Sequence, residues 1–221
     1  MEKMLDIPLF PLNTVLFPGT PISLHIFEPR YKDMVQWCLD NEQPFGVVLI
    51  EEGREALGPL AKPHPVGCTA QISEVEHLPD GRINVLAVGM DRFQIHSLGY
   101  EHDYLTGMVE LLPLYSENLM TVERAGTQLR PWVERYLSVL ASAADEAEFD
   151  VDDLPEDPLA LGYLAAALVQ IPPDEKQPLL ATEEAGELLT NMRDIYRREV
   201  ALLSAMLERE KNQEMGIFSR N

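Results

Sequence analysis

Two periods of apolar and polar residues follow each other along this chain and divide it into two parts. From Met4 to about Leu112, short apolar runs alternate with polar residues in steps of two, which is typical of β-strands. From about Ser116 onward, apolar residues recur at helical spacing. We therefore expect an α+β protein with a β-rich domain over residues 1–115 and a helical bundle over residues 116–221. The expected strands are Leu5–Pro11, Ile22–Phe27, Phe45–Glu51, Val66–His77, Arg82–Met90, Phe93–Tyr100 and Tyr104–Leu112.

Turn and helix signals place these strands in a barrel. The segment Leu78–Arg82 holds Pro, Asp and Gly in the order of a tight turn, so it predicts a hairpin between the strands on either side. Pro29 suits the first position of a helix, which we expect to end at Asn41 and to lie across the strands. Many short strands separated by Gly and Pro favour a small closed or half-open barrel. The buried stripe expected on this helix consists of Tyr31, Met34, Val35, Cys38 and Leu39.

The second part predicts four helices. Pro131 is expected to kink or split the first of them, because proline removes one backbone hydrogen bond. Asp157 and Pro158 form a cap and a first position for the second helix, and Thr182 is expected to cap the last. The expected helices are Asn118–Ala144, Leu159–Gln170, Asp174–Leu180 and a last helix from Thr182 to about Lys211, followed by a frayed end.

The charge of the chain restricts its partners. The formal net charge is −20, which argues against nucleic acid as a partner because phosphate binding needs a cationic face.

We find neither an apolar run long enough to cross a membrane nor the pattern of a signal peptide, and we expect a cytoplasmic protein. Cys38 and Cys68 lie 30 residues apart without a Cys-x-x-Cys motif, so we interpret them as reduced thiols.

The motifs of common enzymes are absent from the sequence. It contains no phosphate-binding loop, no Gly-x-Ser-x-Gly motif and no pair of histidines at metalloprotease spacing. The segment 145–157 holds eight acidic residues and no basic one, but it lacks the glycine and distal Glu of an EF-hand and predicts a solvated loop. Lys176 follows two acidic residues, which favour its charged form, so we do not expect it to act as a catalytic base. We expect no catalytic residue, metal or cofactor; a hydrolase site assembled in space stays an alternative.

The proline-rich segment from Pro8 to Gly19 is the strongest candidate for a binding surface. Proline cannot donate to a strand ladder, so we expect this strand at the border of the sheet. An exposed border with apolar side chains is a docking surface for another extended chain. The competing interpretation is that Phe10 and Phe17 pack in the core, as large aromatic residues usually do.

Three segments at the start of the chain resemble the opening of the Lon N-terminal domain, the substrate-recognition domain of ATP-dependent Lon proteases. They are Pro8–Leu12, Leu16–Gly19 and Leu24–Tyr31. Val66–Ile72, Asp80–Arg82, Val88–Phe93 and the looser match Glu175–Leu180 are similar to later parts of the family, so that the resemblance covers about residues 5–210.

The resemblance implies a PUA-like pseudo-barrel followed by a helical bundle, and a non-catalytic module that binds unfolded or specific protein segments. It leaves open whether a protease or a chaperone is a partner and whether the chain forms a homo-oligomer. PUA-like folds also occur in RNA-binding proteins, an alternative that the negative charge opposes. Within the matching motifs, we expect Arg30 to pair with Glu28 or to bond a strand-end carbonyl. We also expect a turn at Gly19 and core packing for Tyr31. The candidates for peptide binding are Phe10, Pro11, Leu16, Phe17, Pro18, His25, Glu28, Arg30 and Tyr31.

Overall fold

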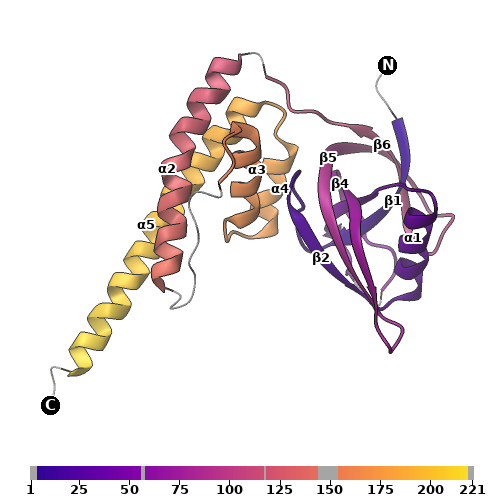
Figure 1. Cartoon of the computed structure of the whole chain (residues 1–221), viewed down its shortest axis with the longest axis horizontal. Coiled ribbons are helices and arrows are strands. Elements are labelled where there is room, and N and C mark those ends of the chain that lie inside the picture. The colour runs from indigo at the N-terminus through magenta and orange to yellow at the C-terminus, as the bar shows by residue number, and fades with distance from the viewer. Residues whose placement is uncertain (1–3, 56–57, 117, 144–153, 219–221) are drawn as a thin grey trace. The chain divides into compact units, whose positions relative to one another are not determined.

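The computed structural model describes residues 4–55, 58–116, 118–143 and 154–218, with side chains up to residue 209. It is an α+β protein, as the sequence predicts, and its elements appear in Figure 1. In chain order they are β1 (Met4–Leu12), β2 (Pro21–Ile26), α1 (Pro29–Asp40), β3 (Phe45–Glu52), β4 (Lys62–His77), β5 (Ile83–Gly99), β6 (Leu105–Leu111), α2 (Leu119–Ala143), α3 (Pro158–Leu168), α4 (Pro173–Ala181) and α5 (Ala185–Phe218).

The contacts of the chain divide it into two compact units. The strand unit consists of Met1–Tyr115 and Ala166–Glu183, and the helix unit consists of Ser116–Ala165 and Glu184–Asn221. The contacts therefore group α4 with the strands, whereas the sequence pattern alone assigned all of residues 116–221 to a bundle. The domain boundary expected between residues 115 and 116 stays a prediction.

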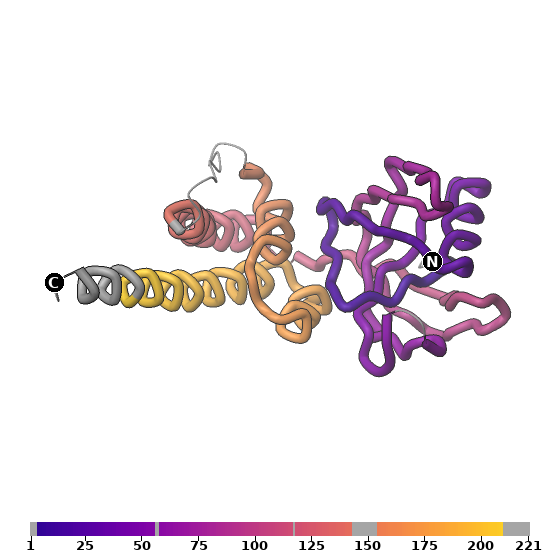
Figure 2. The backbone as a smooth tube through the Cα atoms, turned by 90° about the horizontal axis from the view of Figure 1, so that it is seen from below, coloured from indigo at the N-terminus to yellow at the C-terminus, as the bar shows by residue number. Residues whose placement is uncertain are grey.

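Five strands close into a barrel, and a sixth extends it. The sheet order is β2-β5-β4-β3-β1-β6, and β6 also pairs with β5, so that β5, β4, β3, β1 and β6 form a ring. The barrel and the helix α1 beside it can be followed in Figure 2. β1 and β3 run parallel, and the other paired strands run antiparallel. Among the described strands, β2 pairs with β5 alone, so it is the strand with one free side.

The prediction that the proline-rich strand forms the border of the sheet was wrong. β1 lies between β6 and β3, but it pairs with them in succession: Met4–Leu9 pair with β6 and Leu9–Leu12 with β3. Pro8 lies opposite Thr106 of β6, and Pro11 lies opposite Val48 of β3. Each proline thus lies in a part of β1 that is paired on one side only. The rule that proline avoids doubly paired positions holds locally, although the strand is part of the closed ring.

The hairpin and the helix predicted in the strand unit are present. Asp80 accepts a hydrogen bond from the Arg82 backbone N–H at 3.1 Å, and Gly81 adopts a φ of 80°, which residues with a side chain rarely adopt. The two strands expected after this turn are one, because β5 continues through Asp91 and Arg92 with local shifts of register. α1 begins at Pro29 and ends before Asn41, but Leu39 is 39% exposed and does not join the buried stripe.

Two clusters of apolar side chains fill the strand unit. The larger lies under α1 and the smaller lies on the other side of β1. The larger cluster includes Phe10, Leu16, Leu24, Ile26, Tyr31, Met34, Val35, Cys38 and Phe45, and the smaller consists of Ile7, Leu9, Val48, Phe93, Leu105 and Val109. Alternate residues of β1 therefore stabilise two cores, as the two faces of a strand require.

In the helix unit, α2 and α5 run side by side in the same direction (Figure 1). α2 continues through Pro131, so the helix is not split there, and the ring of Tyr136 meets that of Tyr196 on α5 edge-on at 5.0 Å. The carboxylate of Asp157 accepts the backbone N–H of Ala160 at 2.7 Å, which confirms the predicted cap of α3.

Two predictions about the last helices were wrong. Thr182 ends α4 rather than capping the last helix, because its hydroxyl donates to the carbonyl oxygen of Pro178 at 3.0 Å. α5 begins at Ala185 and continues to Phe218, beyond the end expected near Lys211. Most of the acidic segment 145–157 lies outside the described residues, since residues 144–153 are not described.

Candidate functional site

A small pocket of about 50 Å³ lies where β2 leads into α1. Strand β2 contributes His25 and Ile26, and the residues that follow it contribute Phe27 and Glu28. β1 and α1 add the rings of Phe10 and Tyr31, and a later loop adds Glu55. The pocket thus combines three aromatic rings with two carboxylates, and Phe27 is 45% exposed at its mouth.

Arg30 contacts two residues that line this pocket, Glu28 and Tyr31. Its guanidinium forms an ion pair of 3.0 Å with Glu28, which confirms the predicted pair, and donates a hydrogen bond of 3.5 Å to the Gly58 carbonyl. The same guanidinium lies 4.7 Å from the centre of the Tyr31 ring, a cation–π distance. The Tyr31 ring in turn lies 4.2 Å from that of Phe10. Arg30 therefore orients both Glu28 and Tyr31.

Burial and charge act together on Tyr31. Burial raises the pKa of its phenol; the nearby guanidinium of Arg30 opposes that shift, and the carboxylates of Glu28 and Glu55 add to it. Glu55 is fixed by Asn13, whose backbone N–H and side-chain amide donate to the Glu55 carboxylate at 3.1 and 2.8 Å. The phenol therefore stays protonated at neutral pH and acts as a hydrogen-bonding group rather than as an anion.

A polar row crosses the sheet next to the pocket. Asn84 of β5 donates to the carboxylate of Glu76 on β4 at 2.8 Å, and its side-chain oxygen lies 2.8 Å from His25 Nδ1. Arg82 lies 3.1 Å from the other ring nitrogen of His25. Because a guanidinium can only donate, His25 accepts at Nε2 and carries its proton at Nδ1. His25, Glu76 and Asn84 line a hollow of about 400 Å³ over β2, β5 and β4.

The structure brings together five of the nine residues that the sequence proposed for peptide binding. Phe10, His25, Glu28 and Tyr31 line the pocket, and Arg30 holds its wall. The other four lie elsewhere: Pro11, Leu16 and Phe17 are buried, and Pro18 is half-buried in the following turn. Gly19 has a φ of 75° in that turn, as predicted. The binding roles of all nine residues stay predictions.

Sequence reasoning missed Phe27 and Glu55, which also line the pocket. A signal for Phe27 was present: Leu24 and Ile26 point into the core, so the alternation of a strand puts Ser23, His25 and Phe27 on the outer face. Glu55 gave no such signal, because it reaches the pocket from a loop far away in the sequence.

The groups with altered pKa values offer no reactive side chain in this pocket. Burial raises the pKa of the thiols of Cys38 and Cys68 to about 12, so both are neutral at physiological pH. The expectation that acidic neighbours favour the charged form of Lys176 was wrong: burial lowers its pKa, and its ammonium donates to the Ala167 carbonyl at 2.8 Å. None of the seven lining residues is a Ser, Thr, Cys or Lys. The arrangement can bind a side chain but offers no Ser, Thr, Cys or Lys nucleophile.

The described residues show neither a metal-binding cluster nor a membrane-spanning helix. The part of the chain that the structure describes holds no group of three or more His, Cys, Asp or Glu side chains arranged for a metal ion. No described helix is long and apolar enough to span a bilayer.

Comparison with protein families gives one match over most of the chain. The model described as "ATP-dependent protease La (LON) substrate-binding domain" matches residues 6–198. A Lon protease of Paraburkholderia phytofirmans is 27% identical over 209 residues, which are 94% of this chain and 25% of that protein. Lon protease 2 of Myxococcus xanthus is 25% identical over 219 residues, 97% of this chain and 26% of that protein. The chain thus spans about a quarter of the length of these relatives.

Two solved structures are similar over nearly their whole length. The Lon N-terminal domain protein from Xanthomonas campestris has a TM-score of 0.61 and 25% identity, covering 85% of this chain and 96% of that one. The N-terminal domain of a Mycobacterium avium complex Lon protease has a TM-score of 0.66 at 16% identity, covering 87% and 98%. The second likeness concerns the fold alone.

Proposed function

Because the chain belongs to the family of LON substrate-binding domains, we propose that it binds polypeptide segments as a non-catalytic recognition module. The bound segment lies along the free side of β2 and places one side chain in the pocket at the end of that strand. The observation that carries this proposal is the position of the pocket: Phe27 and its neighbours directly follow the strand that has one unpaired side.

The free side of β2 supplies the main-chain part of this recognition. An extended segment added to a strand edge forms backbone hydrogen bonds whatever its sequence, while pockets for alternate side chains give selectivity. β2 is six residues long, and its outward residues Ser23 and His25 lead to Phe27. The rings of Phe27, Tyr31 and Phe10 favour an apolar or aromatic side chain in the pocket.

The size of such a contact predicts weak binding by a single copy. A peptide that buries about 400 Å² of apolar surface gains roughly 10 kcal/mol at about 25 cal/mol/Å². Association costs about 4–15 kcal/mol, so a micromolar or weaker dissociation constant follows. Several copies presented together would gain avidity, as would a chain that acts as an adaptor for a separate protease or chaperone.

A binding assay with an unfolded polypeptide tests this proposal. Fluorescence anisotropy of labelled casein would be titrated with the wild-type chain and with Phe27→Ser. Loss of a buried aromatic contact costs about 1.5–3 kcal/mol, so the variant is expected to bind at least about tenfold more weakly. Met90→Ser is the matched control, because Met90 is 52% exposed in the same unit but does not line the pocket. Equal affinity of wild type and Phe27→Ser, or equal losses in both variants, would contradict this site.

A further inference from the structure

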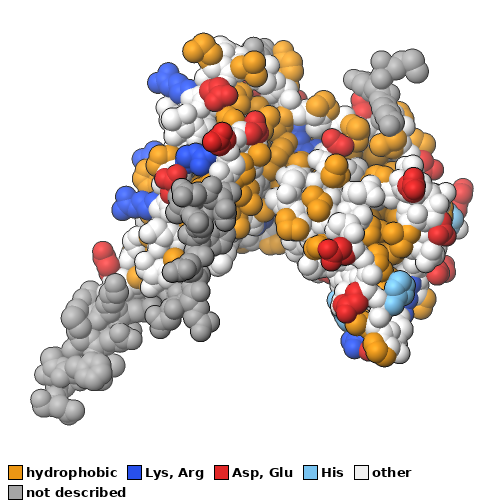
Figure 3. Space-filling model, viewed as in Figure 1, with side chains coloured by type: hydrophobic (Ala, Val, Ile, Leu, Met, Phe, Trp, Pro, Cys, Tyr) orange, Lys and Arg blue, Asp and Glu red, His pale blue; other side chains and the backbone are white. Residues whose placement is uncertain are grey.

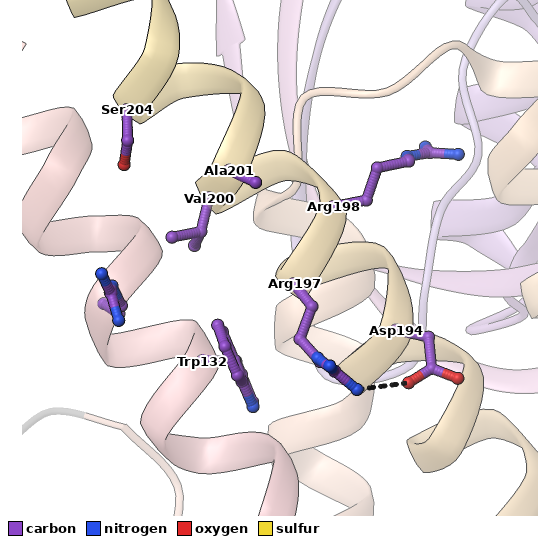
Figure 4. A pocket seen from close by; sticks show the side chains of 8 residues that line it. Trp132, Asp194, Arg197, Arg198, Val200, Ala201 and Ser204 are labelled. Carbon is purple, nitrogen blue, oxygen red and sulfur yellow. Dashed lines mark ion pairs between the residues drawn. The ribbon is translucent and has the colours of Figure 1, made fainter. Parts of the chain in front are cut away.

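The helix unit carries a second groove, of about 590 Å³, on the seam between α2 and α5 (Figure 4). α2 contributes Trp132 and Arg135 to it, and the remaining lining residues come from α5. They are Asp194, Arg197, Arg198, Val200, Ala201 and Ser204. The spacing of the α5 residues explains why they line one side of the groove. Arg197, Ala201 and Ser204 follow one another at helical intervals of four and three residues, so they share a face of α5.

The charge of this groove is opposite to that of the chain. Three arginines and one aspartate line it, in a chain with a formal net charge of −20. On the face shown in Figure 3, Lys and Arg side chains lie among acidic ones over α2 and α5. The three guanidinium groups therefore attract an anionic group to the groove, although the chain as a whole repels it.

The one acidic residue of the groove is already engaged. A single oxygen of Asp194, Oδ1, accepts hydrogen bonds from Nε and a terminal nitrogen of Arg193 at 3.0 and 2.9 Å. Arg193 is itself held on the seam by a 3.0 Å bond to Gln128. Arg197 reaches the same oxygen of Asp194 only at 4.0 Å, so it keeps most of its capacity to bind an anion.

The other two arginines differ in their surroundings. Arg198 pairs with the adjacent Glu199 at 2.9 Å and, in Figure 4, projects away from α2, so it forms the outer rim. Arg135 has no ion-pair partner among the residues that the structure describes. Arg135 and Arg197 are thus the two cations available to a ligand.

Aromatic and apolar side chains also line the groove. The guanidinium of Arg197 lies 5.5 Å from the centre of the Trp132 ring, and Val200 points toward α2 beside it. Trp and Arg are the residues most enriched where protein partners bind tightly. From Asp194 to Ser204 the groove follows roughly 15 Å of helix at 1.5 Å per residue, long enough for about four extended residues.

We propose that the α2–α5 groove binds an acidic polypeptide segment, whose carboxylates pair with Arg135 and Arg197 while an apolar side chain lies against Trp132. An open, elongated groove with two separated cations fits a chain of acidic and apolar residues. This site lies in the helix unit and is independent of the pocket beside β2, so either can fail without the other.

The two tryptophans of the chain provide a direct measurement. Trp37 lies in the strand unit, so the variant Trp37→Phe leaves Trp132 as the only indole reporter. The probe is a synthetic peptide of alternating Glu and Leu without aromatic residues, and its partner is the same peptide with Gln in place of Glu. We expect the Glu peptide to change Trp132 fluorescence saturably, to bind at least tenfold more tightly than the Gln peptide, and to weaken with added salt.

Arginine variants in this background locate the site. Arg135→Gln and Arg197→Gln together are expected to weaken binding about tenfold, since both cations lose their ion pairs with the carboxylates of the peptide. Arg124→Gln is the matched control, because Arg124 is exposed on α2 and does not line the groove. Equal affinity for both peptides, or an equal loss in Arg124→Gln, would overturn the proposal. So would tighter binding of a single-stranded oligonucleotide that the same two substitutions abolish, because the ligand would then be a nucleic acid.

Discussion

The guanidinium of Arg92 donates a hydrogen bond of 2.7 Å to the backbone carbonyl oxygen of Leu180, 88 residues further along the chain. The same nitrogen also donates to the carbonyl oxygen of Thr182. Arg92 is 2% exposed in β5, and its charge faces the carboxyl end of α4, where unpaired carbonyl groups favour a cation. A further bond, from the Gln177 amide to the Val66 carbonyl at 2.9 Å, joins α4 to β4. These contacts explain why α4 groups with the strands.

Removing the Arg92 side chain should destabilise the strand unit. Arg92→Ala leaves the buried carbonyl group of Leu180 and the partly buried one of Thr182 without their charged donor, so we expect a loss of about 2–4 kcal/mol in the free energy of unfolding. Urea denaturation followed by Trp37 fluorescence in a Trp132→Phe background reports on this unit. Arg82→Ala is the control: Arg82 is exposed at the hairpin, so its loss should destabilise the strand unit much less than the loss of Arg92. Similar costs for both substitutions would contradict the role assigned to Arg92.

Gly89 is expected to be the least replaceable glycine of β5. Its N–H donates to the Thr20 carbonyl at 2.9 Å and its carbonyl accepts from Gly19 at 2.8 Å, so β5 and this turn touch through their backbones. An added Cβ would lie 2.3 Å from the carbonyl oxygen of Phe17, too close to fit without a shift of the backbone. We expect Gly89→Ala to cost about 2–3 kcal/mol. Gly81→Ala, which meets nothing within 4 Å and carries only the strain of a positive φ, should cost about 1–2 kcal/mol in the same urea titration.

Features that depend on neighbouring residues could be predicted from the sequence. The turn at Gly81 follows from Asp80 and Arg82 beside it, and the start of α3 follows from Asp157 and Ala160. The same holds for part of the candidate site: His25, Glu28 and Tyr31 belong to one short motif, so predicting one located the others. Phe27 could have been predicted from the alternation of inward and outward residues along β2, but it was overlooked.

Features that depend on distant residues could not be predicted in this way. The proline rule applied to β1 assumes one partner along the whole strand, whereas β1 changes partners at Leu9. Lys176 has acidic neighbours in sequence, but its ammonium is partly buried against the Ala167 carbonyl. The positions of Glu55 in the pocket and of Arg92 at α4 likewise arise from the tertiary structure alone.

The two buried thiols should make the protein sensitive to alkali. Burial raises the pKa of Cys38 and Cys68 from 9.0 to about 12, so between these values the folded chain keeps protons that the unfolded chain releases. Their contribution to stability is therefore complete below about pH 9 and is lost as the pH rises toward 12. We expect the free energy of unfolding to fall from pH 8 to pH 10, and to fall less in the Cys38→Ala, Cys68→Ala double variant. An identical fall in both chains would assign the effect to other groups.

This chain is similar to parts of two Lon proteases, so we ask whether it can cleave protein by itself. The pocket beside β2 offers carboxylates, aromatic rings and an imidazole whose two nitrogens are both engaged, by Asn84 and Arg82. No Ser, Thr or Cys lines the pocket beside that imidazole, so the pocket does not form the Ser–His or Cys–His pair that acyl-transfer enzymes use. We expect the purified chain to leave casein intact in the presence and absence of ATP, measured by release of acid-soluble fragments over hours, while binding the same casein in the anisotropy assay. Replacing each serine in turn by alanine separates a contaminant from a site assembled in space: turnover that disappears with one serine would show that the chain is a hydrolase.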